Sequence, residues 1–179
     1  MACVNGHDEV VRVLLAAKAT VNTQSKSGQS PLWAASFKGH LKCVELLIDA
    51  GANVDIQNED GTTALFVAAQ NGHLRVVEVL IAAKAQVDIQ RKDNVTALRI
   101  ACQNGHDEVV RVLLAAKATV NTQSKSGQSP LWAASFKGHL KCVELLIDAG
   151  ANVDIQNEVS VSSCTHLRDW LVIDLTMSW

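Results

Sequence analysis

The segment KGHLKCVELLIDAGANVDIQNE occurs twice, at Lys38–Glu59 and at Lys137–Glu158. It belongs to a longer copy, since residues 5–59 and residues 104–158 are identical at an offset of 99. Within this copy the dipeptide Gly-His returns every 33 residues, with its glycine at positions 6, 39, 72, 105 and 138. Three units of 33 residues make up the copied block, and the sequence therefore predicts an array of structural repeats.

One unit of this array predicts two short antiparallel helices. Ser30 can cap a first helix that has Pro31 at its first position and ends before Gly39. A second helix is expected over Leu41–Ala50, and Gly51 would end it in the left-handed conformation before an extended segment. The apolar residues of this second helix share one face: Leu41, Val44, Leu47 and Ile48. A single helix pair cannot bury both of its apolar faces, so neighbouring units are expected to stack.

Composition and charge limit the kind of protein. The 179 residues are 48% hydrophobic and 19% charged, as is common for soluble globular proteins. A net charge of −2 gives no basic field, so we expect neither nucleic acid nor a membrane as a partner. No segment reaches the roughly 18 consecutive apolar residues that a spanning helix needs. The expected location is cytoplasmic, with the nucleus as the alternative.

The residue types that carry chemistry are not arranged for catalysis. Histidines of the Gly-His pairs would be separated by helix layers about 8 to 10 Å apart, too far to share one metal ion, and are expected to be structural. The five cysteines form no CxxC pair, and Cys43 and Cys142 lie among apolar residues, so we expect reduced core thiols. The glycines match no phosphate-binding motif. We therefore expect no enzyme activity, no metal and no cofactor.

Four segments carry a family resemblance. These are SPLWAA at Ser30 and Ser129, TALFVAA at Thr63 and TALRIAC at Thr96, each followed by Gly-His and a second helical pattern. With the period of 33, they make the chain similar to ankyrin repeat proteins. The resemblance implies an all-α fold, a solenoid of stacked antiparallel helix pairs joined by β-hairpin-like loops. Its implied units are a partial repeat 1–24, repeats 25–57, 58–90, 91–123 and 124–156, and a non-repeat tail 157–179.

The chain departs from the family pattern inside the repeats. Where the family commonly has a histidine in the first helix, this chain has larger or different side chains: Trp33, Phe66, Arg99 and Trp132. We expect the hydrogen bonds of that histidine to be missing and the seam between units to be repacked. Glycine after the second helix is replaced by Lys18, Lys84 and Lys117, at a cost of about 1 kcal/mol each, so these junctions should be weaker or locally different. Asn94, in place of a turn glycine, is a milder change.

The two ends depart most from the pattern. The chain begins inside the first helix of a unit, and no repeat phase is visible after Glu158. One interpretation is that Thr165 begins a short capping helix whose apolar residues share a face: Leu167, Trp170, Leu171 and Leu175. The other is that the tail is unrelated sequence joined to a broken array, or that the chain is a fragment of a longer protein.

In ankyrin proteins, partners usually dock on a concave face formed by the hairpin tips and the first helices. The resemblance places these residues at the tips: Lys26, Ser27, Gln29, Glu59, Asp60, Thr62, Lys92, Asp93, Val95, Lys125, Ser126 and Gln128. It places these on the exposed side of the first helices: Phe37, Lys38, Gln70, Asn71, Gln103, Asn104, Phe136 and Lys137. The two phenylalanines are candidate anchors. The alternative is that they pack against a neighbouring first helix.

The resemblance implies a non-catalytic scaffold or adaptor, here expected to be a monomer that binds a protein partner. Because each unit touches only its neighbours, copying three units lengthens the binding surface and the core together. Two other hypotheses stay open. One is that the chain is a regulatory part of a larger enzyme or channel. The other is that it is a degenerate duplicate without a selected partner.

Overall fold

The computed structural model describes residues 2–154, and this part of the chain contains ten α-helices and no strand. The helices are α1 (Ala2–Asn5), α2 (Asp8–Ala16), α3 (Pro31–Lys38), α4 (Leu41–Asp49), α5 (Ala64–Gln70), α6 (Leu74–Ala82), α7 (Ala97–Asn104), α8 (Asp107–Ala115), α9 (Pro130–Lys137) and α10 (Leu140–Asp148). The predicted all-α class is confirmed. The tail helix expected at Thr165 lies outside the described residues, as does Cys164.

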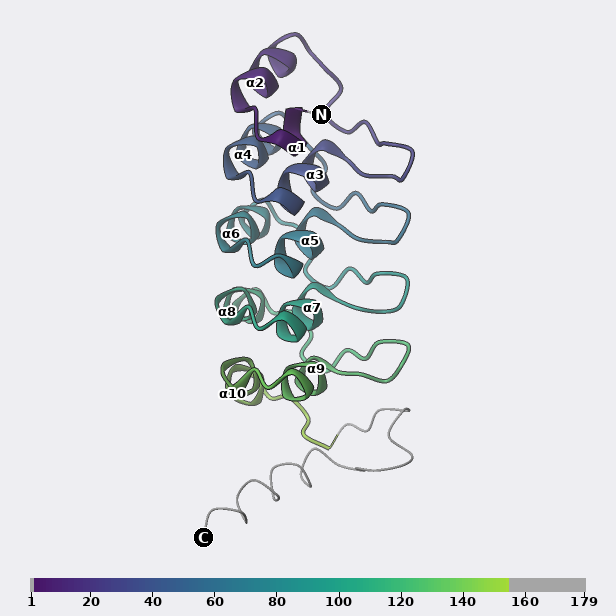
Figure 1. Ribbon diagram of the computed structural model, residues 1–179, viewed down its shortest axis with the longest axis vertical. Coiled ribbons are helices and arrows are strands. Elements are labelled where there is room, and N and C mark those ends of the chain that lie inside the picture. The colour runs from purple at the N-terminus through teal and green to yellow at the C-terminus, as the bar shows by residue number, and fades with distance from the viewer. Residues whose placement is uncertain (1, 155–179) are drawn as a thin grey trace.

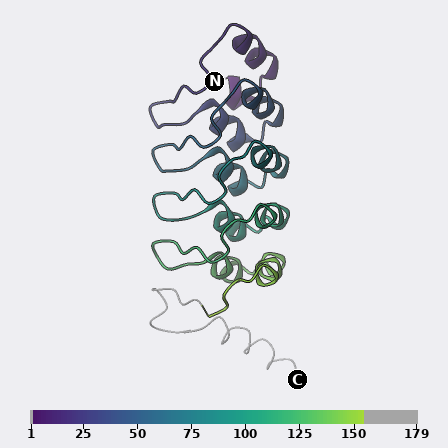
Figure 2. The ribbon, with the colours of Figure 1, turned by 180° about the vertical axis from the view of Figure 1, so that it is seen from behind.

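The helices form two columns (Figure 1). The odd-numbered helices stack on one another, α3 on α5, α5 on α7 and α7 on α9, and the even-numbered helices form the second column beside them. Hairpin loops project from the odd-numbered column, all to the same side, and the view from behind keeps this arrangement (Figure 2). The predicted solenoid of stacked helix pairs is therefore confirmed.

The first helix of each full unit begins where a hydroxyl can cap it. The Ser30 hydroxyl accepts a hydrogen bond from the backbone N–H of Trp33 at 3.1 Å, and Pro31 opens α3. Thr63 caps α5 through the N–H of Phe66 at 3.2 Å in the same way. Each cap stabilises its helix by about 1 kcal/mol. The predicted start of the first helices is confirmed.

The hairpins are held to one another by their backbones. Within one hairpin, the N–H of Ser25 donates to the carbonyl of Gln29 at 3.0 Å. Between hairpins, the N–H of Lys92 donates to the carbonyl of Asp60 at 3.0 Å, and that of Lys125 to Asp93 at 2.9 Å. The loops are thus hairpin-like, as predicted, and their tips form a continuous edge along the array.

The second helices end alike whether glycine or lysine follows. Lys117 has φ +66° and Gly51 has φ +82°, both left-handed. The N–H of Lys117 donates to the carbonyl of Leu114 at 3.0 Å, and the N–H of Gly51 donates to that of Ile48 at 2.9 Å. The left-handed conformation at the lysines is confirmed, and the alternative of a locally different geometry is wrong. These junctions therefore keep the backbone strain of a non-glycine residue.

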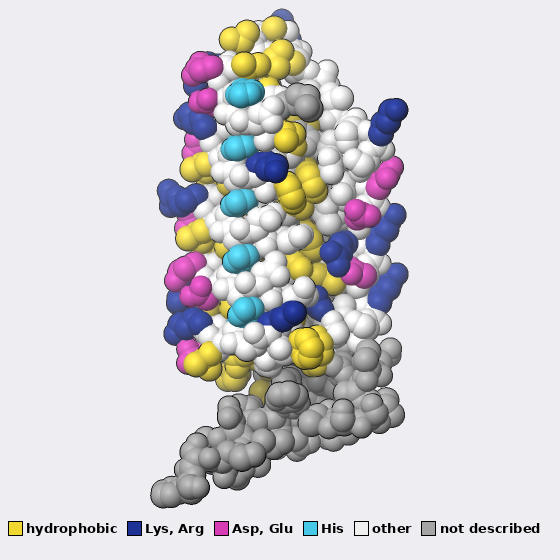
Figure 3. Space-filling model, in the orientation of Figure 1, with side chains coloured by type: hydrophobic (Ala, Val, Ile, Leu, Met, Phe, Trp, Pro, Cys, Tyr) yellow, Lys and Arg dark blue, Asp and Glu magenta, His cyan; other side chains and the backbone are white. Residues whose placement is uncertain are grey.

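The Gly-His dipeptides connect successive units. A Cβ built on Gly39, which has φ +75°, would lie 2.6 Å from Nδ1 of His73 in the next unit. The Nε2 of His73 then donates to the backbone carbonyl of Phe37 at 3.2 Å. Equivalent bonds hold His40, His106 and His139, and the histidines form one column on the surface (Figure 3). Their predicted structural role is confirmed for these four.

The core lies between the two helix columns and contains three of the cysteines. Cys43, Cys102 and Cys142 are buried and Cys3 is half-buried, and all four are free thiols. Burial raises the pKa of each thiol, to about 11 for Cys142. These cysteines are therefore protonated packing residues, as expected from the sequence.

Candidate protein-binding surface

The seam between first helices and hairpins is built from matched pairs of residues. The indole Nε1 of Trp33 donates to the hydroxyl of Thr62 in the next hairpin at 2.9 Å. At the equivalent place one unit later, Phe66 and Val95 lie in one small apolar cluster. Trp33 therefore makes a hydrogen bond to the next unit through its indole, at a position where the sequence predicted only a repacked seam.

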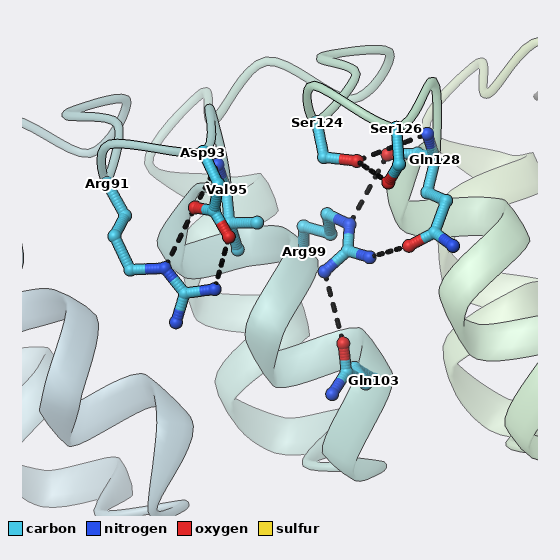
Figure 4. Close-up of polar contacts among 8 residues, drawn as sticks. All are labelled: Arg91, Asp93, Val95, Arg99, Gln103, Ser124, Ser126 and Gln128. Atoms are coloured by element: carbon cyan, nitrogen blue, oxygen red, sulfur yellow. Dashed lines mark hydrogen bonds and ion pairs between the residues drawn. The ribbon is translucent and has the colours of Figure 1, made fainter. Parts of the chain in front are cut away.

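Arg99 occupies the same place one unit further on and is 6% exposed. Its Nε donates to the backbone carbonyl of Gln128 at 3.3 Å, and its Nη2 donates to the Gln128 side-chain oxygen (Figure 4). Nη1 donates to Oε1 of Gln103 at 3.1 Å. Burial lowers the pKa of the guanidinium from its ordinary value. Arg99 therefore also links two units, through bonds that the sequence analysis did not expect.

A hollow of about 510 Å³ opens between the hairpins and the first helices, where the family resemblance places the concave face. Its lining comes from three successive units: Gln29, Trp33, Phe37, Asn58, Asp60, Thr62, Val67, Gln70, Arg91, Lys92 and Asp93. Figure 3 shows hydrophobic side chains between the helix column and the hairpins, with charges of both signs along the hairpin tips. The hollow therefore has an apolar floor and a charged rim.

The rim contains one tight ion pair. Nε of Arg91 donates to Oδ1 of Asp93 at 2.8 Å, and Nη2 lies against the other carboxylate oxygen. This bond holds the pKa of the Asp93 carboxyl below its ordinary value and raises that of Arg91. The guanidinium also lies over the ring of Phe66, 5.4 Å from its centroid. The two opposite charges neutralise each other, and the bonded side chains form one wall of the hollow.

The structure brings part of the predicted surface together in this hollow. The predicted residues that line it are Gln29, Phe37, Asp60, Thr62, Gln70, Lys92 and Asp93. The predicted residues outside it are Lys26, Ser27, Lys38, Glu59, Asn71, Val95, Gln103, Asn104, Lys125, Ser126, Gln128, Phe136 and Lys137. Four lining residues were missed: Trp33, Asn58, Val67 and Arg91. Of these, Trp33 could have been found, because it stands one helical turn before Phe37.

Two residues expected at exposed tips are buried. Thr62 is 7% exposed because the Trp33 indole covers its hydroxyl, and Val95 is 2% exposed beside Phe66. Their side chains therefore offer little surface to a partner. Their backbones shape the hairpins, while the neighbouring tip residues Asp60 and Lys92 remain exposed.

The two candidate aromatic anchors stack within their own helices. The rings of Trp33 and Phe37 are 5.3 Å apart and nearly parallel, and those of Trp132 and Phe136 are 4.9 Å apart. Phe37 is 36% exposed and Phe136 is 66% exposed. Their stacking partners are therefore tryptophans of their own helices, and both rings keep an exposed side.

Residues 2–154 contain no group of three or more histidine, cysteine, aspartate or glutamate side chains that could hold a metal ion. In the same range, no helix combines the length and the hydropathy required to cross a bilayer.

The stacked helix pairs and the bonded hairpins define a helical repeat protein of the solenoid class. A family model described as ankyrin repeats (3 copies) matches residues 1–93 and 81–157. The chain therefore belongs to the ankyrin repeat family. Ankyrin repeats are generally modules of protein–protein interaction, and proteins of this family are typically non-catalytic. A search of curated proteins found no match.

Proposed function

We propose that this protein is a non-catalytic scaffold or adaptor that binds one segment of a partner protein in the hollow of its concave face. The observation that carries the proposal is the lining of this hollow by predicted contact residues from three units. An apolar floor inside a polar rim is the usual anatomy of a protein interface. We propose that the protein acts as a monomer.

The floor of the hollow offers a place for an apolar anchor of the partner. Trp33 and Phe37 contribute apolar surface from α3, and the buried Val67 of α5 lies beneath them in the lining. The Trp33 indole is fixed by its bond to Thr62 and by stacking on Phe37. Side chains that are already fixed lose little conformational entropy when a partner binds, which favours affinity.

The repeated block provides a matched pair of variants for the test. Phe37 and Phe136 lie in identical segments and make the same stacking contact, but only Phe37 lines the hollow. Phe37→Lys should cost somewhat more stability than Phe136→Lys, because Phe37 is less exposed, and the two variants should differ in binding. The measurement is a quantitative affinity capture from extracts of the cells that express the protein, read by mass spectrometry.

We expect a partner that the wild type and Phe136→Lys retain and Phe37→Lys loses by about tenfold or more, the effect of removing an interface anchor. Circular dichroism and the urea midpoint must first show that both variants are folded. Equal retention by all three proteins, or loss only with Phe136→Lys, would contradict binding in this hollow. No specific partner for the folded wild type would contradict the adaptor function itself.

A further inference from the structure

Arg99, Gln103 and Gln128, here called the donor cluster, lie where α7 meets the next hairpin, with Arg99 buried and both glutamines partly exposed. The cluster has hydrogen-bond donors that no described residue uses. A guanidinium carries five N–H groups, and three of those on Arg99 are bonded to oxygens of Gln103 and Gln128. Both glutamine side-chain oxygens therefore point at Arg99, which leaves their amide N–H groups directed elsewhere (Figure 4). The cluster therefore keeps two guanidinium N–H groups and two amide NH₂ groups that make no hydrogen bond to the described residues.

The cation of the cluster lacks an anion among residues 2–154. Arg99 is 6% exposed, and no carboxylate of the described residues lies within ion-pair distance of it. Its oxygen partners are neutral amides. A buried charge is unfavourable unless it is paired, and a carboxylate matches the planar fork of arginine. The described residues therefore supply no directly bonded counter-ion for Arg99 and no acceptors for its remaining N–H groups.

The surroundings of the cluster add positive charge. Lys92 and Lys125 are exposed on the two hairpin tips beside it. Asp93 attracts Arg99 electrostatically, but its carboxylate is bonded to Arg91. The remaining acids of the 91–137 segment, Asp107 and Glu108, begin α8 in the other helix column. This half of the concave face therefore favours an anionic ligand.

The cluster is also rigid. The N–H of Gln128 donates to the hydroxyl of Ser124 at 3.2 Å, and that hydroxyl contacts the hydroxyl of Ser126 at 3.0 Å. The Gln128 backbone carbonyl and side-chain oxygen both bind Arg99. A ligand would thus meet donors that are already in place, which lowers the entropy lost on binding.

We propose that the donor cluster is a carboxylate-binding subsite of the groove, and that the partner segment is an acidic peptide whose Asp or Glu side chain docks on Arg99. This rests on the proposed function, because it concerns the same concave face. The apolar hollow would hold the anchor of the segment, and the donor cluster would select its charge.

The test needs a variant that removes the charge and still joins the two units. The chain supplies a template for this variant. Two units earlier, Trp33 stands in the position of Arg99 and Thr62 in the position of Gln128, and the two side chains are hydrogen-bonded. Arg99→Trp with Gln128→Thr copies that bonded pair, so the variant should fold. A random peptide library is selected on the wild type and on this double variant, and a selected peptide is titrated by fluorescence anisotropy together with its analogue in which Glu or Asp is replaced by Gln or Asn.

We expect acidic residues to be enriched on the wild type only. The amide analogue should bind the wild type about tenfold more weakly than the acidic peptide, as expected for a lost charge-assisted bond. The double variant should bind the two peptides equally. An analogue with phosphoserine in place of the acidic residue, bound more tightly than the acidic peptide by the wild type only, would overturn the carboxylate assignment.

Two further outcomes separate this inference from the proposed function. If peptides bind the wild type, lose binding with Phe37→Lys, and show no preference for the acidic form, the carboxylate subsite is wrong and the groove remains a binding surface. If no peptide binds the groove of the folded wild type, both proposals are wrong.

Discussion

Helices α2 and α8 have the same nine residues, DEVVRVLLA, and differ in their surroundings. In α8, Val109 is 2% exposed and Leu113 is 0% exposed. The corresponding residues of α2 are Val10, which is 49% exposed, and Leu14, which is 48% exposed. Identical segments of the array thus contribute very different amounts of buried apolar surface.

The difference follows from the neighbours of each helix. Helix α8 packs between α6 and α10, whereas α2 packs on α4 and exposes the side chains on its other face. In a repeat array, stability is the sum of what each unit contributes and of the contacts between neighbours. Local sequence therefore defines the helix, and the position in the array determines how much that helix stabilises the protein.

The largest expected effect comes from one substitution made in both helices. Leu113→Ala removes a fully buried side chain and should lower the free energy of unfolding by about 2 to 5 kcal/mol. Leu14→Ala, at the same place in the identical helix, should cost about 1 kcal/mol or less, because Leu14 is half exposed. Urea denaturation followed by circular dichroism measures both.

Equal losses in these two variants would contradict the comparison, since they would mean that α2 is as well covered in solution as α8. The slope of the unfolding transition should stay unchanged in Leu14→Ala, as a control that the variant still unfolds in one step.

A second pair of substitutions tests the contacts of the Gly-His dipeptides. Gly39 and Gly138 lie in identical segments with φ +75° and +74°. Of these two, among residues 2–154, only Gly39 has a histidine ring where a Cβ would be. Both alanine substitutions should cost about 1 kcal/mol for the left-handed backbone. Gly39→Ala should cost about 2 to 3 kcal/mol in all, because the His73 ring must also move away from its hydrogen bond.

Differential scanning calorimetry on the two variants gives the ranking directly. A melting temperature lowered more by Gly138→Ala than by Gly39→Ala would show that the histidine contact does not constrain Gly39. A Gly39→Ala variant that also carries His73→Ala should recover the part of the loss that comes from the clash.

Much of the fold could be predicted from residues that act locally. Ser30, Pro31, Gly39 and Gly51 act within a few positions of themselves, so caps, helix ends and the period were visible in the sequence. The reason for Gly-His was not visible, because the His73 ring meets a glycine of the preceding unit. A contact between units leaves no local pattern.

The site was predicted less completely, for the same reason. The tip positions follow from the repeat register, which predicts Asp60 and Lys92 at hairpin tips, and both residues line the hollow. The burial of Thr62 depends on the Trp33 indole, and the donor cluster depends on Arg99 reaching Gln128. Both contacts join residues 29 positions apart. That spacing is the signal that could have paired them.

The smallest expected effect concerns the lysines that follow α2 and α8. Lys18 and Lys117 have φ +59° and +66°, so Lys117→Gly should relieve strain and raise the free energy of unfolding by about 0.5 to 1 kcal/mol. Lys18→Gly relieves the same strain in a helix covered on one side, which should open locally before the array unfolds. The stabilisation by Lys18→Gly should therefore slow the hydrogen exchange of the α2 amides and hardly change the urea midpoint. Equal gains in the midpoint would mean that α2 unfolds together with the rest of the array, and that one covered face is enough to make a unit cooperative.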